Sequence, residues 1–382
     1  MDEGRCTGGI LGQLRSGRVT ILLLAMVVCL AGSCVGLPRK AAVALEPPEQ
    51  LQDGWETSSP EAEGLDAMVL SELTNKFRGD TYGYIHGCVI IRNGKLIYEQ
   101  YFHGFRQATL HRLYSVTKSV TSALMGIALE QGLIDGLQER AIDYFPEYVD
   151  DDWDQRKDGI TLEHLLTMAS GLAYDEWTYR YSDARNSYTQ MTGSSDWMKW
   201  TFDQPLLAEP GMRFTYSSGN SHLFSGILFK ATGMFADEYA EQVLFGPLGI
   251  ADYEWVNGNG YPATSGAMGG LKLRPRDMAK LGFVYLNDGK WNGDQVVPGR
   301  WVTASLTPRM DAGGGTYYGY QWWLHSSTVS GHQVEWMAGR GYGDQLIGVF
   351  PSLNMVIVIT AGNESRAAGL DDAVLSILRA AL

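Results

Sequence analysis

Apolar positions near both ends of the chain form short runs that predict strands. The runs at 87–91 and 96–102 flank Arg92-Asn93-Gly94-Lys95. An Asn-Gly pair between two β-rich runs is the strongest local signal for a hairpin. Strand patterns return at 318–325, 332–337, 345–350 and 355–360. We therefore expect an antiparallel sheet built from both ends of the chain.

Helical spacing dominates the middle of the chain. Apolar residues recur every three or four positions after Ser115, and further helices are expected to begin near Thr161, Ser194 and Ser218. Pro275 is expected to open a helix that runs to Leu286. Terminal helices are predicted at 61–77 and 367–382. No internal repeat is visible, so the pattern predicts a mostly helical region inserted between the first and later strands.

The first 34 residues differ from the rest. Three arginines precede the apolar run 19–30, and Ala31-Gly32-Ser33 offers a cleavage site. This layout predicts an export signal, too short for a comfortable membrane span, and hence a periplasmic or extracellular protein. Cys34 directly follows the small residues and is a candidate for lipid attachment to a membrane. Plain cleavage and an uncleaved anchor stay open as alternatives.

The predicted domains follow from these patterns. Residues 1–34 are the signal, 35–55 a proline-containing linker, and 56–382 a single domain. Its sheet part is expected at about 56–111 and 318–382, and its helical part at about 112–317.

Composition narrows the possible partners. The chain has 382 residues, of which 45% are hydrophobic and 19% charged, as in ordinary globular proteins. Its net charge of −13 argues against nucleic acid as a partner, because phosphate backbones are bound through clustered Lys and Arg. Only Cys88 of the four cysteines lies in the body of the chain, which excludes a disulfide framework and a cysteine-based zinc site. We expect no metal and no cofactor.

Ser115 and Lys118 form the only Ser-x-x-Lys pair in the chain. On a helix the two side chains share one face, so the amine lies beside the hydroxyl. A lysine surrounded by apolar groups tends to lose its proton and can then activate a serine nucleophile. The alternative is an ordinary helix cap, for which serine is a preferred residue.

Two later segments can complete such a site. Tyr216 lies where the loop 210–217 enters a helix, although a half-buried tyrosine that stabilises the turn is the alternative. The segment 336–343, Trp-Met-Ala-Gly-Arg-Gly-Tyr-Gly, is rich in small residues that let a ligand approach the backbone. Its N–H groups, together with that of Ser115, are candidates for an oxyanion hole; a tight hairpin is the alternative.

With these three segments the chain resembles the serine β-lactamase and penicillin-binding-protein superfamily, whose signature is S-x-x-K, Y-x-N or S-x-N, and K-T-G. It is most similar to the class C-like branch of esterases, D-amino-acid peptidases and 6-aminohexanoate-dimer hydrolases. The resemblance covers about residue 60 to the end and includes the segments 160–171, 210–220, 269–282 and 318–323. It implies an α+β fold in which helices flank an antiparallel sheet.

The resemblance also assigns site residues. It places the nucleophile at Ser115, the lysine at Lys118 and the catalytic tyrosine at Tyr216. The oxyanion donors fall on the backbone N–H groups of Ser115 and Arg340. Substrate contacts are implied for three further residues, namely Tyr174, Ser218 and Gly339.

Departures from the signature bear on the substrate. Ser218 stands where β-lactamases carry the Asn of Y-x-N, and Met337-Ala338-Gly339 stands in place of K-T-G. The missing lysine removes a cation that would meet a substrate carboxylate, although Arg340 is a partial replacement. We therefore expect a serine hydrolase that cleaves a small ester or amide. The alternatives are a β-lactamase or D-alanyl carboxypeptidase, and a non-catalytic envelope binding protein of the same fold.

Overall fold

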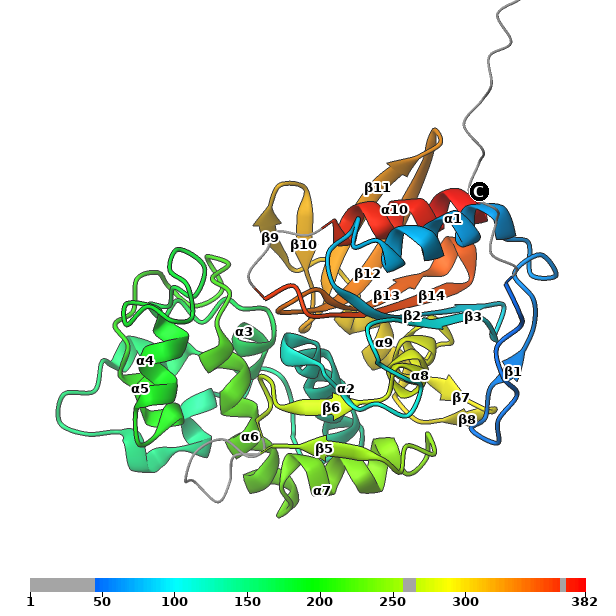
Figure 1. Ribbon diagram of the computed structural model, residues 1–382. Coiled ribbons are helices and arrows are strands. Elements are labelled where there is room, and N and C mark those ends of the chain that lie inside the picture. Colours follow the sequence, from blue (N-terminus) through cyan, green and yellow to red (C-terminus); the bar gives the residue numbers. More distant parts are fainter. Residues whose placement is uncertain (1–44, 257–265, 365–368) are drawn as a thin grey trace, which may run out of the picture. The chain divides into compact units, whose positions relative to one another are not determined.

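A sheet of nine strands is the largest element of the computed structural model (Figure 1). The structure describes residues 45–256, 266–364 and 369–382. The strand order is β1-β3-β2-β14-β13-β12-β11-β10-β9, so that strands from the two ends of the chain meet where β2 pairs with β14. The strands are β1 (Glu56–Thr57), β2 (Ile85–Arg92), β3 (Lys95–Tyr101), β9 (Met310–Gly313), β10 (Thr316–Tyr318), β11 (Trp323–Val329), β12 (His332–Gly341), β13 (Gln345–Phe350) and β14 (Met355–Ala361).

Both faces of this sheet are covered by helices, which explains why its middle strands are apolar at nearly every position. Successive side chains of a strand point to opposite faces. In β14, Val356 and Val358 belong to one hydrophobic core, and Ile357 and Ile359 belong to another. The helices α1 (Ala67–Arg78) and α10 (Leu370–Ala381) lie against one face, and α2 (Thr117–Glu130), α8 (Pro275–Leu286) and α9 (Gly299–Ser305) against the other (Figure 1).

The segment between β4 and β9 is mostly helical. It contains two small sheets, β4-β6-β5 and β7-β8. In the described part of the chain no helix is both long and apolar enough to span a membrane. The other elements of this segment are β4 (His111–Arg112), α3 (Leu162–Leu166), α4 (Ser187–Gly193), α5 (Trp197–Asp203), α6 (Ser218–Thr232), α7 (Ala236–Ala240), β5 (Tyr253–Trp255), β6 (Leu271–Leu273), β7 (Lys290–Trp291) and β8 (Asp294–Gln295).

Two local predictions are confirmed. Asn93 and Gly94 have φ angles of 52° and 79°, as a two-residue hairpin turn requires, and they join β2 to β3. Helix α8 spans Pro275–Leu286 as predicted, with the proline in its first turn, where a missing N–H costs nothing.

Two other predictions are wrong in their bounds. Helix α1 begins at Ala67 rather than at residue 61, because the Asp66 carboxylate caps it by accepting backbone N–H groups. The predicted strand 318–325 is interrupted between β10 and β11. Gln321 there has a φ of 63° and donates from its side chain to the carbonyls of Leu165 and Leu166. This segment therefore leaves the sheet to contact α3.

The predictions for the export signal and for Cys34 lie outside the described residues. Of the predicted linker, residues 45–55 are described. Trp55 is only 2% exposed, and its indole N–H donates to the carbonyl of Arg276. Its ring makes edge contacts with Phe283 and Trp291. The end of the predicted linker therefore packs on α8.

Candidate active site

Ser115 lies in a short 3-10 turn, Tyr114–Val116, directly before α2. The preceding residue, Tyr114, has a φ of 48°, a left-handed conformation that is uncommon for tyrosine and is often kept at functional sites. No side chain caps the start of α2, so the alternative interpretation of Ser115 as its cap is wrong. The hydroxyl of Ser115 instead meets the side chain of Lys118.

Lys118 reaches Ser115 from the first turn of α2. Its Nζ donates to Ser115 Oγ at 2.8 Å, to Ser218 Oγ at 3.1 Å and to the carbonyl of Met268 at 3.0 Å. The side chain is 1% exposed, and this burial lowers the pKa of Lys118 to about 8, although the charge of Glu176 opposes the shift. A substantial fraction of Lys118 is therefore neutral near physiological pH and can accept a proton.

Tyr216 lies two residues before α6, at the loop-to-helix junction that the sequence predicts. Its ring contacts those of Trp177 and Trp323, with centroid separations of 5.2 Å and 5.6 Å, and the two indoles also contact each other at 6.1 Å. Burial raises the pKa of the Tyr216 phenol, while an interaction with Ser115 lowers it slightly. The phenol therefore keeps its proton at neutral pH and can donate it beside Ser115.

Strand β12 brings Arg340 beside the serine turn. Pairing of β12 with β11 ends at Ala338, whereas Gly339, Arg340 and Gly341 pair only with β13. The glycines permit the approach to α2, because a methyl group at Gly341 would lie 2.3 Å from the carbonyl oxygen of Leu113. The edge of β12 beyond Ala338 thus faces the helix start, where the predicted oxyanion donors would be needed.

Ser218 is joined to a buried carboxylate that the sequence analysis missed. Its backbone N–H donates to Glu176 Oε2 at 3.0 Å, and its hydroxyl donates to Oε1 at 3.1 Å. Glu176 is only 4% exposed and also accepts a hydrogen bond from Tyr181. Glu176 is the one Glu in the stretch 174–188, which is rich in Tyr and Trp, and nothing in the local sequence indicates that it is buried.

The other predicted substrate contacts lie in different surroundings. Tyr174 is 8% exposed and packs with Met191 and Met268, so the structure places it in a hydrophobic cluster behind the cleft wall. A Cβ at Gly339 would lie 3.0 Å from Ser119 Oγ, which places this glycine against α2. Trp177 and Trp323, which sequence reasoning did not select, line the cleft instead.

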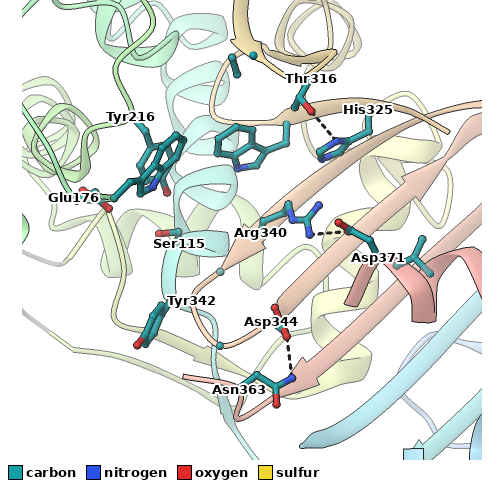
Figure 2. Close-up of a pocket in the computed structure, with 18 of the residues that line it drawn as sticks. Ser115, Glu176, Tyr216, Thr316, His325, Arg340, Tyr342, Asp344, Asn363 and Asp371 are labelled. Atoms are coloured by element: carbon teal, nitrogen blue, oxygen red, sulfur yellow. Dashed lines mark hydrogen bonds and ion pairs between the residues drawn. The ribbon is translucent and has the colours of Figure 1, made fainter. Parts of the chain in front are cut away.

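A cleft of about 1350 Å³ opens over these residues. Figure 2 shows Glu176 and Tyr216 on one side of Ser115, and Arg340 with Asp371 on the other. The guanidinium of Arg340 donates to Asp371 at 2.8 Å, so its charge is already paired. A smaller pocket of about 390 Å³ also reaches Ser115 and is lined by Tyr114, Tyr188 and Trp197, among others.

Comparisons with known proteins show the family of the chain. The family model described as Beta-lactamase matches residues 85–380. The 6-aminohexanoate-dimer hydrolase of Paenarthrobacter ureafaciens is 26% identical over 290 residues, which cover 71% of this chain and 70% of that relative. A beta-lactamase of Escherichia coli strain K12 is 30% identical over 154 residues, which cover 40% of this chain and 36% of that protein.

Solved structures show the fold. The structure of EstCE1, titled a hydrolase with promiscuous acyltransferase activity, superposes with a TM-score of 0.66 at 17% identity. The match covers 84% of this chain and all of that one (100%). The predicted fold, an antiparallel sheet flanked by helices, is therefore confirmed.

Proposed function

Since this chain belongs to the beta-lactamase family of serine hydrolases, we propose that it cleaves an ester or amide bond through an acyl-enzyme on Ser115. The observation that carries the proposal is the contact of 2.8 Å between Lys118 Nζ and Ser115 Oγ, with the lysine almost fully buried. A neutral amine in this position can take the serine proton as the hydroxyl attacks the substrate carbonyl.

The other groups of the site fit the remaining steps. The backbone N–H groups of Ser115 and Arg340 would stabilise the oxyanion, and the helix start adds a favourable dipole. The protonated Tyr216 phenol would pass its proton to the leaving group. Water would then attack the acyl-enzyme and lose a proton to the Tyr216 phenolate, while the Lys118 ammonium returns its proton to Ser115 Oγ as the acyl bond breaks.

At β12 the cleft lacks the free cation that would meet the carboxylate of a β-lactam or a peptidoglycan peptide. Met337 stands where the K-T-G signature has lysine, and Arg340 is held by Asp371. A carboxylate would therefore meet no unpaired cation at this edge of the site. We favour a carboxylesterase or a 6-aminohexanoate-oligomer type of amidase over a β-lactamase or D-alanyl carboxypeptidase.

A serine substitution tests this proposal. Ser115→Ala should abolish turnover of p-nitrophenyl butyrate by the purified protein, because no other group can carry the acyl intermediate. Ser59→Ala, a change outside the cleft, should leave turnover intact. A fluorophosphonate probe should label wild type but not Ser115→Ala. Retained turnover, or labelling of both proteins, would exclude Ser115 as the nucleophile.

A further inference from the structure

Three hydrogen-bond partners surround the Lys118 amine, and two of them can only accept from it. The carbonyl of Met268 has no proton to give. The Ser218 hydroxyl has one proton, and this proton is donated to Glu176. A hydroxyl that has donated its proton can only accept further hydrogen bonds. Ser218 therefore accepts from Lys118, as Met268 does.

This distribution of protons decides how a neutral Lys118 is oriented. A neutral amine has two N–H donors and one lone pair. Met268 and Ser218 take the two donors, so the lone pair is left to face the third partner, Ser115. A base must direct its lone pair at the proton that it abstracts.

From this geometry we infer that Glu176 is a positioning residue, which polarises the Ser218 hydroxyl so that neutral Lys118 turns its lone pair to Ser115. The inference rests on the proposed function and deepens it. Glu176 does not contact Lys118 directly but acts through Ser218, and its negative charge would also stabilise the ammonium that forms when Lys118 takes the proton.

Glu176 is held firmly enough for this role. Its carboxylate accepts three hydrogen bonds, from the Ser218 backbone, the Ser218 hydroxyl and the Tyr181 phenol. Its own carbonyl accepts from Asn186, a fully buried side chain that also bonds Tyr179. The loop around Glu176 is therefore held in place by hydrogen bonds to buried groups.

Other titratable groups near Glu176 are phenols. Burial raises their pKa values, and the Glu176 charge raises them further, so these groups stay neutral across the range in which Lys118 titrates. They are Tyr174, Tyr181, Tyr188, Tyr216 and Tyr318. Lys118 is thus the group whose titration near neutral pH reports a change of charge at Glu176.

Glu176→Gln is the sharpest variant because it keeps the shape of the side chain. The Ser218 backbone N–H can only donate, so it takes the amide oxygen, and the amide NH2 then faces the Ser218 hydroxyl. The hydroxyl must now accept from Gln and turn its proton toward Lys118, where it competes for the lone pair. We expect kcat/KM for p-nitrophenyl butyrate to fall by about tenfold or more.

The pH profile supplies a second readout. Removing the negative charge makes protonated Lys118 less favourable, so the rising limb of kcat/KM should move to lower pH by about one unit. Glu176→Asp keeps the charge and should leave the limb near its wild-type position even if the rate falls. Asp175→Asn is the matched control, because Asp175 accepts N–H groups of Trp177 and Thr178 and orders the same loop. It should not move the limb.

A double-mutant cycle separates positioning from loop folding. Ser218→Ala removes the hydroxyl through which Glu176 acts, so Glu176→Gln should cost much less rate in that background than in wild type. Equal costs in both backgrounds, or an unmoved limb in Glu176→Gln, would overturn the inference. Absence of Ser115-dependent turnover in wild type would contradict the proposed function itself. Normal turnover without the expected effects of Glu176→Gln would contradict only the role of Glu176.

Discussion

At the scale of single residues, the site depends on the burial of a lysine. Lys118 is almost fully removed from water, and its positive form loses the solvation that an exposed ammonium enjoys. The negative charge of Glu176 opposes this effect, and the pKa of Lys118 is lowered to about 8. The amine is therefore close to the pH range in which a general base is most effective.

The pH dependence of wild-type turnover follows from this value. Below the pKa, Lys118 is protonated and cannot accept a proton, so kcat/KM for a neutral ester should rise about tenfold per pH unit and level off above about pH 8. Initial rates from pH 5.5 to 9.5 at constant ionic strength test this expectation. Fluorophosphonate labelling rates should follow the same curve, and a flat profile would contradict the role of Lys118 as the base.

At the scale of elements, the close approach of β12 to the serine turn shapes the site. The strand can reach Leu113 only because glycine occupies position 341, where any side chain would collide with a backbone oxygen. A backbone atom cannot move aside as the end of a flexible side chain can. The position of the Arg340 N–H relative to Ser115 therefore depends on a residue that carries no functional group.

Gly341→Ala tests this dependence. The added methyl group must push β12 away from Leu113, so we expect the free energy of unfolding to fall by about 1–3 kcal/mol. Displacement of the Arg340 N–H from its position beside Ser115 should also lower kcat for p-nitrophenyl butyrate by about tenfold or more. Urea denaturation and steady-state kinetics measure both effects. Gly136→Ala is the control, since nothing lies within 4 Å of a methyl group there, and wild-type behaviour of Gly341→Ala would refute the steric explanation.

At the scale of the whole molecule, one glutamine joins the sheet to the helical part. Gln321 lies between β10 and β11 and is 2% exposed. Its side chain bonds the carbonyls of Leu165 and Leu166 and accepts from Ser221 of α6, and its backbone carbonyl accepts from Ser119 of α2. The sheet, α2, α3 and α6 therefore share one buried polar connection.

Gln321→Leu should be costly for stability. The substitution removes the side-chain hydrogen bonds to the carbonyls of Leu165 and Leu166 and takes from the buried Ser221 hydroxyl its acceptor. We expect a loss of about 2–4 kcal/mol in the free energy of unfolding. Urea denaturation followed by tryptophan fluorescence measures this loss. Gln333→Leu, on the exposed face of β12, should change stability by less than about 0.5 kcal/mol. Equal stability of the two variants would show that the hydrogen bonds of Gln321 do not stabilise the contact between the sheet and the helical part.

Much of the fold could be predicted from local patterns in the sequence. The Asn93-Gly94 turn, the helix that Pro275 opens and the apolar strands of the last third all rest on short-range preferences that hold in any context. The start of α1 and the break at Gln321 were not predicted. Each is set by side-chain hydrogen bonds, from backbone N–H groups to Asp66 and from Gln321 to α3, and the sequence pattern does not show that these bonds form. The Asp66 cap is a local choice, whereas the break at Gln321 is made by a partner distant in the chain.

The sequence by itself determined the reaction class that we propose, because Ser115 and Lys118 lie only three positions apart, across a 3-10 turn that leads into the first turn of α2. Only the tertiary structure decided what surrounds them. Glu176 lies 42 positions from Ser218, and Met268 lies 150 positions from Lys118, yet each makes a direct hydrogen bond there. Spacing along a chain predicts contacts within one element, whereas the burial that shifts a pKa arises only when several elements close around a side chain.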